Sequence, residues 1–272
     1  MNHIIVVIPA RMSSQRLPGK PMRLIAGVPM IERVYQQVTL CPGLHEVIVA
    51  TEDRIIYDFC AAQHIPCQMT DPCPSGTDRL AQVAAHRGYA DELYVNVQGD
   101  EPLFDPRQMA SLLECCRKHG PERETDFGGT LGAATPRREG GMFVVVKPLG
   151  PGEDPGPSRN KVVLAADGRC LYFSRALLPF SRDTVFPPTA DGKPQEFIKR
   201  YQRVGPYAFA PWALQMYAKL GESYLERVEK LEQLRLLEAG VPIYAGITDV
   251  DSRPVDTEED LAAVEAEIRM RA

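Results

Sequence analysis

Cationic, hydroxyl and glycine residues gather in one short segment near the start of the chain, which reads Arg11-Met-Ser-Ser-Gln-Arg-Leu-Pro-Gly-Lys20. Arginine forks, a lysine point charge and backbone N–H groups can together hold a chain of phosphates. The segment lacks the G-x-x-x-x-G-K-[ST] pattern of a Walker A loop, so a phosphate cradle here would be of another kind. The alternative is a basic surface loop that is simply solvated.

Two carboxylates far apart in the chain are candidate metal ligands. Asp100 follows an apolar run at 93–97, and Asp256 precedes the last predicted helix. Mg²⁺ typically takes one or two carboxylates together with phosphate oxygens and water. The alternatives are a turn that begins at Asp100 and a plain helix N-cap at Asp256. Only proximity of the two side chains in the fold would separate these interpretations.

A third polar segment, Ser75-Gly-Thr-Asp-Arg79, lies at a junction between a loop and a helix. It could bind a nucleotide through a helix N-terminus or through backbone contact with a base, and a capped helix with a tight turn is the alternative. The patterns G-x-S-x-G, H-E-x-x-H and G-x-G-x-x-G do not occur, and the five histidines are not at metal-ligand spacing. Chemistry would therefore rest on positioning and charge neutralisation, as phosphoryl or nucleotidyl transfer does.

The apolar pattern predicts the elements that would position these side chains. Strands are expected at 4–8, 46–51, 66–69 and 93–97, alternating with helices at 30–38, 53–62, 78–86 and 106–118. This alternation predicts right-handed crossovers and an α/β fold, with a mostly parallel sheet flanked by helices. We expect Pro9 to end the first strand, because proline cannot continue a central strand. The cationic segment then lies at the carboxyl end of that strand, where open α/β sheets bind ligands.

The second half of the chain is less regular. Strands are expected at 128–134, 161–164, 170–174, 205–210 and 243–247, with a Pro/Gly-rich loop at 148–157. Helices are expected at 211–219, at 228–239 with Gly240 as its stop, and from an N-cap at Asp256 to Met270.

Composition limits the class of protein. The 272 residues carry a net charge of −5, so no overall field attracts nucleic acid. No apolar run approaches the roughly 20 residues of a membrane span, and no signal-peptide pattern is present. The seven cysteines are odd in number and contain no C-x-x-C, so neither a disulfide framework nor a cysteine metal site is expected. We expect one cytoplasmic domain over residues 1–272, without nucleic-acid or membrane partners.

Six segments, in order along the chain, resemble motifs of the 3-deoxy-manno-octulosonate (KDO) cytidylyltransferases. They are Pro9-Ala-Arg-Met-Ser-Ser-Gln-Arg-Leu-Pro-Gly-Lys-Pro21, Ser75-Gly-Thr-Asp-Arg-Leu80, Val95-Asn-Val-Gln-Gly-Asp-Glu-Pro102, Leu171-Tyr-Phe-Ser-Arg175, Leu231-Glu-Gln-Leu-Arg235 and Val255-Asp-Thr-Glu-Glu-Asp-Leu261. The likeness covers nearly the whole chain. It implies a Rossmann-like nucleotidyltransferase that transfers CMP from CTP to a sugar acid, with Mg²⁺ as cofactor and pyrophosphate as the second product.

The resemblance also implies roles for single residues. The nucleotide would contact Pro9, Ala10, Arg11, Arg16, Lys20, Ser75, Gly76 and Gln98, and the catalytic group would be Lys20, Arg16 and Asp100. Asp100 and Asp256 would hold the Mg²⁺. The acidic acceptor would contact Arg79, Arg203, Tyr207, Glu232 and Gln233. A smaller lobe at roughly 134–215 would lie on the acceptor side and help to form a homodimer.

Two positions depart from the resembled family. Arg203 and Arg227 stand where histidine is usual, and both would lie near the acceptor. A guanidinium that is always charged suits a more anionic acceptor, so a phosphonate acid such as phosphonoformate is a second candidate. A nucleotide-binding regulator without turnover is the alternative of another class. The joint presence of Lys20, Asp100 and Asp256 speaks against it.

Overall fold

The computed structural model describes residues 3–14, 16–90, 93–120, 139–150, 153–180 and 199–271. The strand expected at 128–134 lies outside these residues. Within them, all seven cysteines are free thiols, and no helix is both long enough and apolar enough to cross a bilayer.

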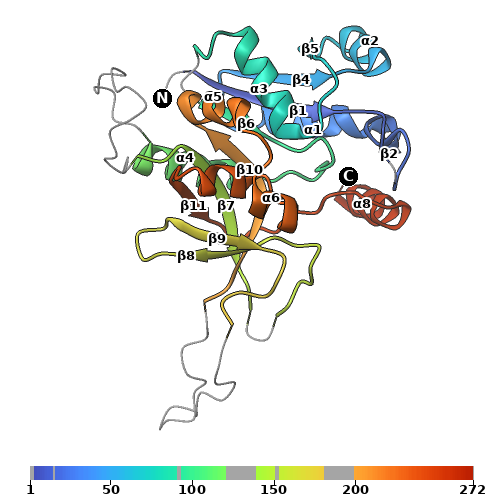
Figure 1. Cartoon of the computed structure of the whole chain (residues 1–272). Helices are drawn as coiled ribbons and strands as arrows, with labels where there is room; N and C mark the ends of the chain where they lie inside the picture. Colours follow the sequence, from blue (N-terminus) through green and yellow to red (C-terminus); the bar gives the residue numbers. More distant parts are fainter. Residues whose placement is uncertain are drawn as a thin grey trace, which may run out of the picture.

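A central sheet of the order β11-β7-β10-β6-β1-β4-β5 organises the chain (Figure 1). The last four strands in this order are parallel to one another: β6 (Leu93–Asn96), β1 (Ile4–Ala10), β4 (Glu46–Thr51) and β5 (Cys67–Met69). β10 (Tyr201–Phe209) lies antiparallel between β6 and β7 (Met142–Pro148), and β11 (Ile243–Ile247) pairs parallel with β7. The sheet is therefore mostly parallel, as the strand–helix alternation predicted.

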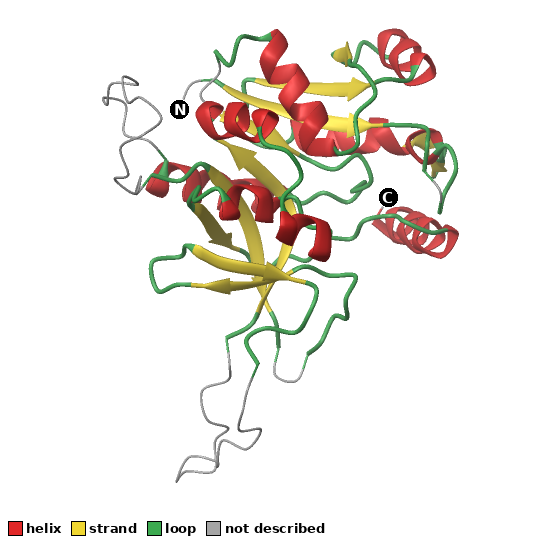
Figure 2. Cartoon of the chain, viewed as in Figure 1, coloured by secondary structure: helices red, strands yellow, loops and turns green. Residues whose placement is uncertain are grey.

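Helices cover both faces of the sheet (Figure 2). Alternate residues of β1 enter two separate cores, because strand side chains point to opposite faces: Ile4, Val6 and Ile8 face one, and Ile5 and Val7 the other. The first core is covered by α1 (Met30–Thr39), α2 (Arg54–Ala62), α4 (Pro106–His119) and α8 (Glu258–Arg271). The second is covered by α3 (Gly76–His86), α5 (Pro211–Lys219) and α7 (Gln233–Glu238).

β1 continues through Pro9 to Ala10, so the expected stop at Pro9 is wrong. Pairing of β1 with β6 ends at Val7, and beyond that residue β1 pairs only with β4. A proline is tolerated there, because the strand no longer needs donors on both sides. The sheet therefore delivers Pro9 and Ala10 to its carboxyl edge as ordered backbone.

The helix expected at 228–239 is two helices. Ser223 and Glu226 form a capping box that starts α6 (Tyr224–Glu229) earlier than expected, and Lys230 ends it in the left-handed conformation at φ 53°. The chain then turns and α7 begins at Gln233. The apolar pattern concealed this break, because Leu225 of α6 and Leu234 of α7 pack on the same hydrophobic core, the one that contains Ile5 and Val7.

Several elements were not foreseen. β7 is a strand with buried residues from Met142 to Val146, and β10 begins four residues before the expected strand. A 3-10 turn at Lys20–Met22 leads into a short hairpin of β2 (Leu24–Ile25) and β3 (Val28–Pro29). The β8 (Lys161–Leu164) and β9 (Cys170–Ser174) hairpin formed as expected, and β8 pairs with the start of β10. The smaller lobe expected at about 134–215 stays a prediction. Two strands within that range, β7 and β10, belong to the central sheet.

Candidate functional site

A cleft of about 890 Å³ opens at the carboxyl ends of β1 and β6, beside the start of α3. It is lined by Pro9, Ala10, Arg11, Ser13, Ser14, Arg16, Lys20, Pro21, Cys73, Ser75, Gly76, Arg79, Gln98, Gly99, Asp100 and Asp256. The cationic segment, the start of α3 and both candidate metal carboxylates therefore meet in one place. The fold thus brings together three polar segments that the sequence analysis treated separately.

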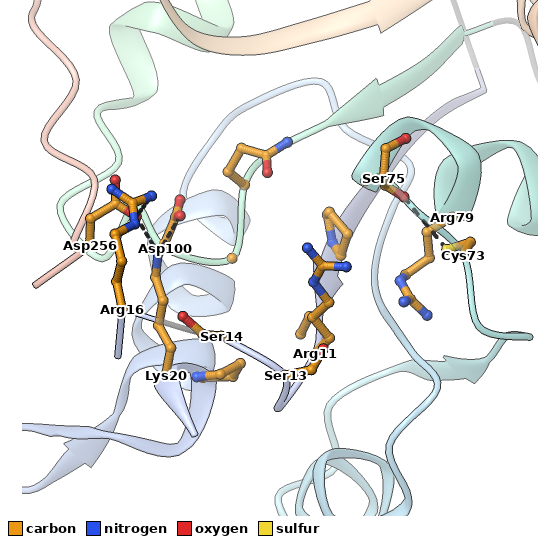
Figure 3. A pocket seen from close by; sticks show the side chains of 16 residues that line it. Arg11, Ser13, Ser14, Arg16, Lys20, Cys73, Ser75, Arg79, Asp100 and Asp256 are labelled. Carbon is orange, nitrogen blue, oxygen red and sulfur yellow. Dashed lines mark hydrogen bonds and ion pairs between the residues drawn. The ribbon is translucent and has the colours of Figure 1, made fainter. Parts of the chain in front are cut away.

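One end of the cleft is strongly charged (Figure 3). The ammonium group of Lys20 donates to Asp100 Oδ2 at 2.6 Å and to Asp256 Oδ1 at 2.9 Å. A guanidinium nitrogen of Arg16 lies 2.9 Å from the same Asp256 oxygen. Two carboxylates that contact the same ammonium group would repel each other, and the charges of Lys20 and Arg16 offset that repulsion. The arrangement is a compact set of paired charges, in which the Lys20 side chain is largely buried and Arg16 is exposed.

Backbone geometry places three of these side chains, those of Lys20, Asp100 and Asp256. Gly19 adopts φ 65° and starts the turn that carries Lys20. The Val255 N–H donates to the Asp100 carbonyl oxygen at 2.8 Å, which joins the two carboxylate-bearing segments. The N-cap expected at Asp256 is wrong, since Thr257 and Asp260 cap α8 by bonding to each other's backbone N–H. The Asp256 side chain is therefore free to face the cleft.

Asp53 is a supporting residue that the sequence analysis missed as a site residue. Its Oδ2 accepts a hydrogen bond from the Met12 N–H at 2.7 Å, while its own N–H donates to Thr51 Oγ1 at 3.0 Å. Asp53 lies just after β4 and does not line the cleft. It holds the cationic segment between Arg11 and Ser13. Its place after a buried strand, the same place that Asp100 has after β6, was the available signal.

Arg79 is almost fully buried, with 2% of its surface exposed. One guanidinium nitrogen donates to Glu52 Oε2 at 2.7 Å, and another donates to Thr70 Oγ1. Its charge is thus paired with Glu52 at the wall of the cleft. The acceptor contact expected for Arg79 stays a prediction.

The other expected acceptor residues, Arg203, Tyr207, Glu232 and Gln233, are not among the residues that line the cleft. The Tyr207 hydroxyl pairs with Thr77 Oγ1 at 2.9 Å and accepts from Gln98 Nε2 at 3.4 Å. The Arg203 guanidinium lies 4.9 Å from the centre of the Tyr207 ring. Burial raises the pKa of Glu232. Gln233 is also buried, whereas Arg227 is exposed on α6. The structure thus links Arg203 and Tyr207 to the cleft through Gln98, and places Arg227 at the surface.

A buried carboxylate lies next to Asp100. Glu101 is 7% exposed, and burial raises its pKa to about 7, with the charge of Asp100 adding to the shift. Arg203 and Arg159 act in the opposite direction. The Asp-Glu pair was visible in the sequence, but only burial distinguishes the half-exposed Asp100 from Glu101.

The donor set at the charged end fits Mg²⁺. Among the described residues no three histidine, cysteine or acidic side chains gather as a complete metal cage. Two carboxylates converge on one cationic atom, and the neighbouring cleft has room for phosphate oxygens and water. Mg²⁺ prefers this kind of incomplete oxygen site over a dedicated protein cage.

Comparison with known proteins gives a consistent result. A family model described as cytidylyltransferase matches residues 5–243. A 3-deoxy-manno-octulosonate cytidylyltransferase of Koribacter versatilis is 40% identical over 98% of this chain and 90% of its own length. An 8-amino-3,8-dideoxy-manno-octulosonate cytidylyltransferase of Shewanella pealeana is 37% identical over 98% of both chains.

Two solved structures are similar to this chain along nearly its whole length. A CMP:2-keto-3-deoxy-manno-octonic acid synthetase complexed with CTP superposes with a TM-score of 0.82, at 33% identity, over 99% of this chain and 100% of the other. A 4-diphosphocytidyl-2C-methyl-D-erythritol synthase of Anaerococcus prevotii superposes with a TM-score of 0.57 at 13% identity, over 98% of this chain and 96% of the other. The second likeness concerns the fold alone.

Proposed function

Because this chain belongs to the cytidylyltransferase family, we propose that it transfers CMP from CTP to a sugar acid of the 3-deoxy-octulosonate type and releases pyrophosphate. One observation carries the proposal. The cleft combines a cationic segment with two carboxylates that meet on Lys20, at the carboxyl edge of the sheet. The full-length likeness to KDO cytidylyltransferases supports the choice of nucleotide and acceptor.

Arg11, Arg16 and Lys20 hold the triphosphate in this proposal. All three line the cleft, and Lys20 has a third N–H that is not used by Asp100 or Asp256. An acceptor oxygen attacks the α-phosphorus, and the bond to the bridging oxygen of pyrophosphate breaks. Arg16 and Lys20 stabilise the negative charge that develops on the leaving pyrophosphate. No covalent intermediate with the protein is required.

Asp100 and Asp256 hold Mg²⁺ in this proposal. When bound, the ion would offset charge on the phosphates and lower the pKa of the attacking hydroxyl. The two carboxylates stand on segments joined by the Val255–Asp100 backbone bond, so their separation is set by the fold. Lys20 keeps them close without an ion, since its ammonium group contacts both.

The acceptor lies on the side of Gln98 and Tyr207 in this proposal. Arg203 supplies a cation for the acceptor's acidic group, while Glu232 and Gln233 offer polar contacts to hydroxyl groups. The relatives differ in their named acceptors, which carry either an oxygen or an amino group at C8. A homodimer, expected from the family, is proposed as the assembly and can be checked by light scattering.

Formation of the CMP-acid tests the function directly. The purified protein is incubated with CTP, Mg²⁺ and one acid from a panel of KDO, 8-amino-3,8-dideoxy-KDO and phosphonoformate, and CMP-acid formation is followed by mass spectrometry. We expect turnover with one of the two sugar acids and none when Mg²⁺ is chelated. Turnover with phosphonoformate alone would replace the acceptor but keep the cytidylyl transfer. CTP binding without turnover on any acid would favour the regulator.

A further inference from the structure

Both peptide groups beside Asp256 are held by one carboxylate oxygen. The Asp256 N–H and the Thr257 N–H each donate to Asp260 Oδ2 at 2.9 Å. The N–H of the preceding residue, Val255, donates to the Asp100 carbonyl oxygen at 2.8 Å. The two peptide planes that flank a Cα set the direction in which its side chain leaves the backbone. Asp260 therefore fixes the direction of the Asp256 side chain.

One of these bonds goes beyond what a helix cap requires. In a capping box, the N-cap residue and the third helical residue bond to each other's backbone N–H through their side chains. Thr257 and Asp260 make both of these bonds at the start of α8, since the Asp260 N–H also donates to Thr257 Oγ1 at 3.2 Å. The bond from the Asp256 N–H is additional. It engages the residue whose carboxylate contacts the two cations Lys20 and Arg16.

The helix that carries Asp260 is itself fixed in place. Leu261 and Val264 are buried in the first of the two cores of the sheet. Glu258, the first residue of α8, accepts two hydrogen bonds from the Arg23 guanidinium at 2.5 and 2.7 Å. Arg23 ends the 3-10 turn that starts at the last residue of the cationic segment. Asp260 thus stands on an element that is tied both to the core and to the opposite side of the charged end.

We propose that Asp260 is a positioning residue for the metal site: its carboxylate holds both peptide groups beside Asp256 and so aims the Asp256 carboxylate at the ion. The proposal rests on the proposed function, in which Asp100 and Asp256 hold Mg²⁺. Asp260 does not line the cleft, so it acts through Asp256 and not by touching the ion. A ligand on an ordered backbone binds more tightly, because less conformational entropy is lost when the ion binds.

Metal binding to the full-length protein tests the proposal without any turnover. Mn²⁺ replaces Mg²⁺ as the probe, because both ions suit oxygen ligands, and water-proton relaxation in the presence of CTP and no acceptor reports the ion bound to the protein. Asp260→Ala should weaken Mn²⁺ binding by about tenfold, the lower end of the range for residues that support a metal ligand. Asp260→Asn should bind Mn²⁺ nearly as the native protein does, since its amide oxygen can accept the same N–H groups. A loss in Asp260→Asn equal to that in Asp260→Ala would overturn the proposal, because charge and not the hydrogen bonds would then matter.

Thr257→Val is the matched control. It removes the hydroxyl that accepts the Asp260 N–H but leaves the Asp260 carboxylate with both of its N–H donors. This variant should lower the melting temperature much as Asp260→Ala does, yet keep the native Mn²⁺ affinity. If it weakens Mn²⁺ binding as much as Asp260→Ala, only the helix cap matters and the positioning role is overturned.

Two further variants keep the outcome decisive. Asp260→Ser has a side chain too short to hold the Asp256 N–H, so it should repeat the loss even if Asp260→Ala does not fold. Asp256→Ala should weaken Mn²⁺ binding at least as much as Asp260→Ala, and native affinity in this variant would overturn the proposal. Native Mn²⁺ binding together with no CMP-acid from any acceptor would instead contradict the proposed function alone.

Discussion

The ammonium group of Lys20 lies 2.6 Å from a carboxylate oxygen of Asp100, although 80 residues separate them in the chain. This contact joins the cationic segment after β1 to the acidic turn after β6. Asp256 shares the same ammonium group from a third segment. The site thus has its charges balanced by the protein before any substrate binds, which lowers the cost of bringing two carboxylates together.

Asp100→Asn should keep the fold and remove most metal-dependent turnover. The amide has the same shape but lacks the charge that Mg²⁺ requires. The loss in kcat/KM should exceed the roughly 10- to 100-fold typical of residues that only support a metal ligand. Initial rates over a Mg²⁺ titration provide the measurement. A near-native rate at saturating Mg²⁺ would mean that Asp100 does not bind the ion.

Lys20→Ala should slow transfer by about 10²- to 10³-fold, the usual cost of losing one group that stabilises developing charge. CTP affinity should also fall, because a phosphate contact is lost. The exposed Lys118 on α4 offers the control, and Lys118→Ala should behave like the native protein. Indistinguishable kinetics of the two variants would remove the triphosphate role of Lys20.

Asp53→Ala should weaken CTP binding by roughly fivefold, or about 1 kcal/mol, because the Met12 N–H loses its partner and the cationic segment loosens. Asp53→Asn should restore binding, since an amide oxygen can accept the same bond. Asp58→Ala removes another acidic residue nearby, on exposed α2 surface, and serves as the control. If Asp53→Asn binds CTP as weakly as Asp53→Ala, charge rather than the hydrogen bond is what matters.

Glu101 should make stability depend on pH. Its pKa rises from 4.5 to about 7 on folding, so the folded state holds the proton more tightly than the unfolded state. The contribution is fully present below about pH 4.5 and is lost as pH rises through about 7, by up to about 3 kcal/mol. Glu101→Gln should flatten this part of the profile, measured by denaturant unfolding at pH 5 and pH 8. Parallel profiles would refute the shift.

Arg203→His reports on the acceptor. With KDO the change should be mild, because histidine is usual at this position in the resembled family. With a dianionic phosphonate it should cost about 1.5–3 kcal/mol, the range for a hydrogen bond to a charged group, or roughly one to two decades in kcat/KM. Arg227→His is the control, since Arg227 is exposed on α6 and should not affect either acceptor. Equal losses with the phosphonate in the two variants would contradict a role that is specific to Arg203.

The parallel half of the fold follows from local patterns. β4 and α1 formed where apolar runs and helical spacing indicated, because burial on both faces leaves a continuous signal and an amphipathic helix leaves a periodic one. β7 was missed although Met142 to Val146 is such a run. The break at Lys230 was also missed, because one residue in the left-handed conformation leaves no periodic trace.

Residue type and position along the chain were enough to identify the side chains that could do chemistry, namely those of the cationic segment, the two carboxylates and the start of α3. The folded chain was needed to see that Asp256 does not cap α8 and that it contacts the same Lys20 ammonium group as Asp100. The fold was also needed to see that Asp53 accepts a hydrogen bond from the Met12 N–H. The physical reason is that such contacts depend on strand order and on atomic distances of about 3 Å, which residue spacing along a chain does not encode.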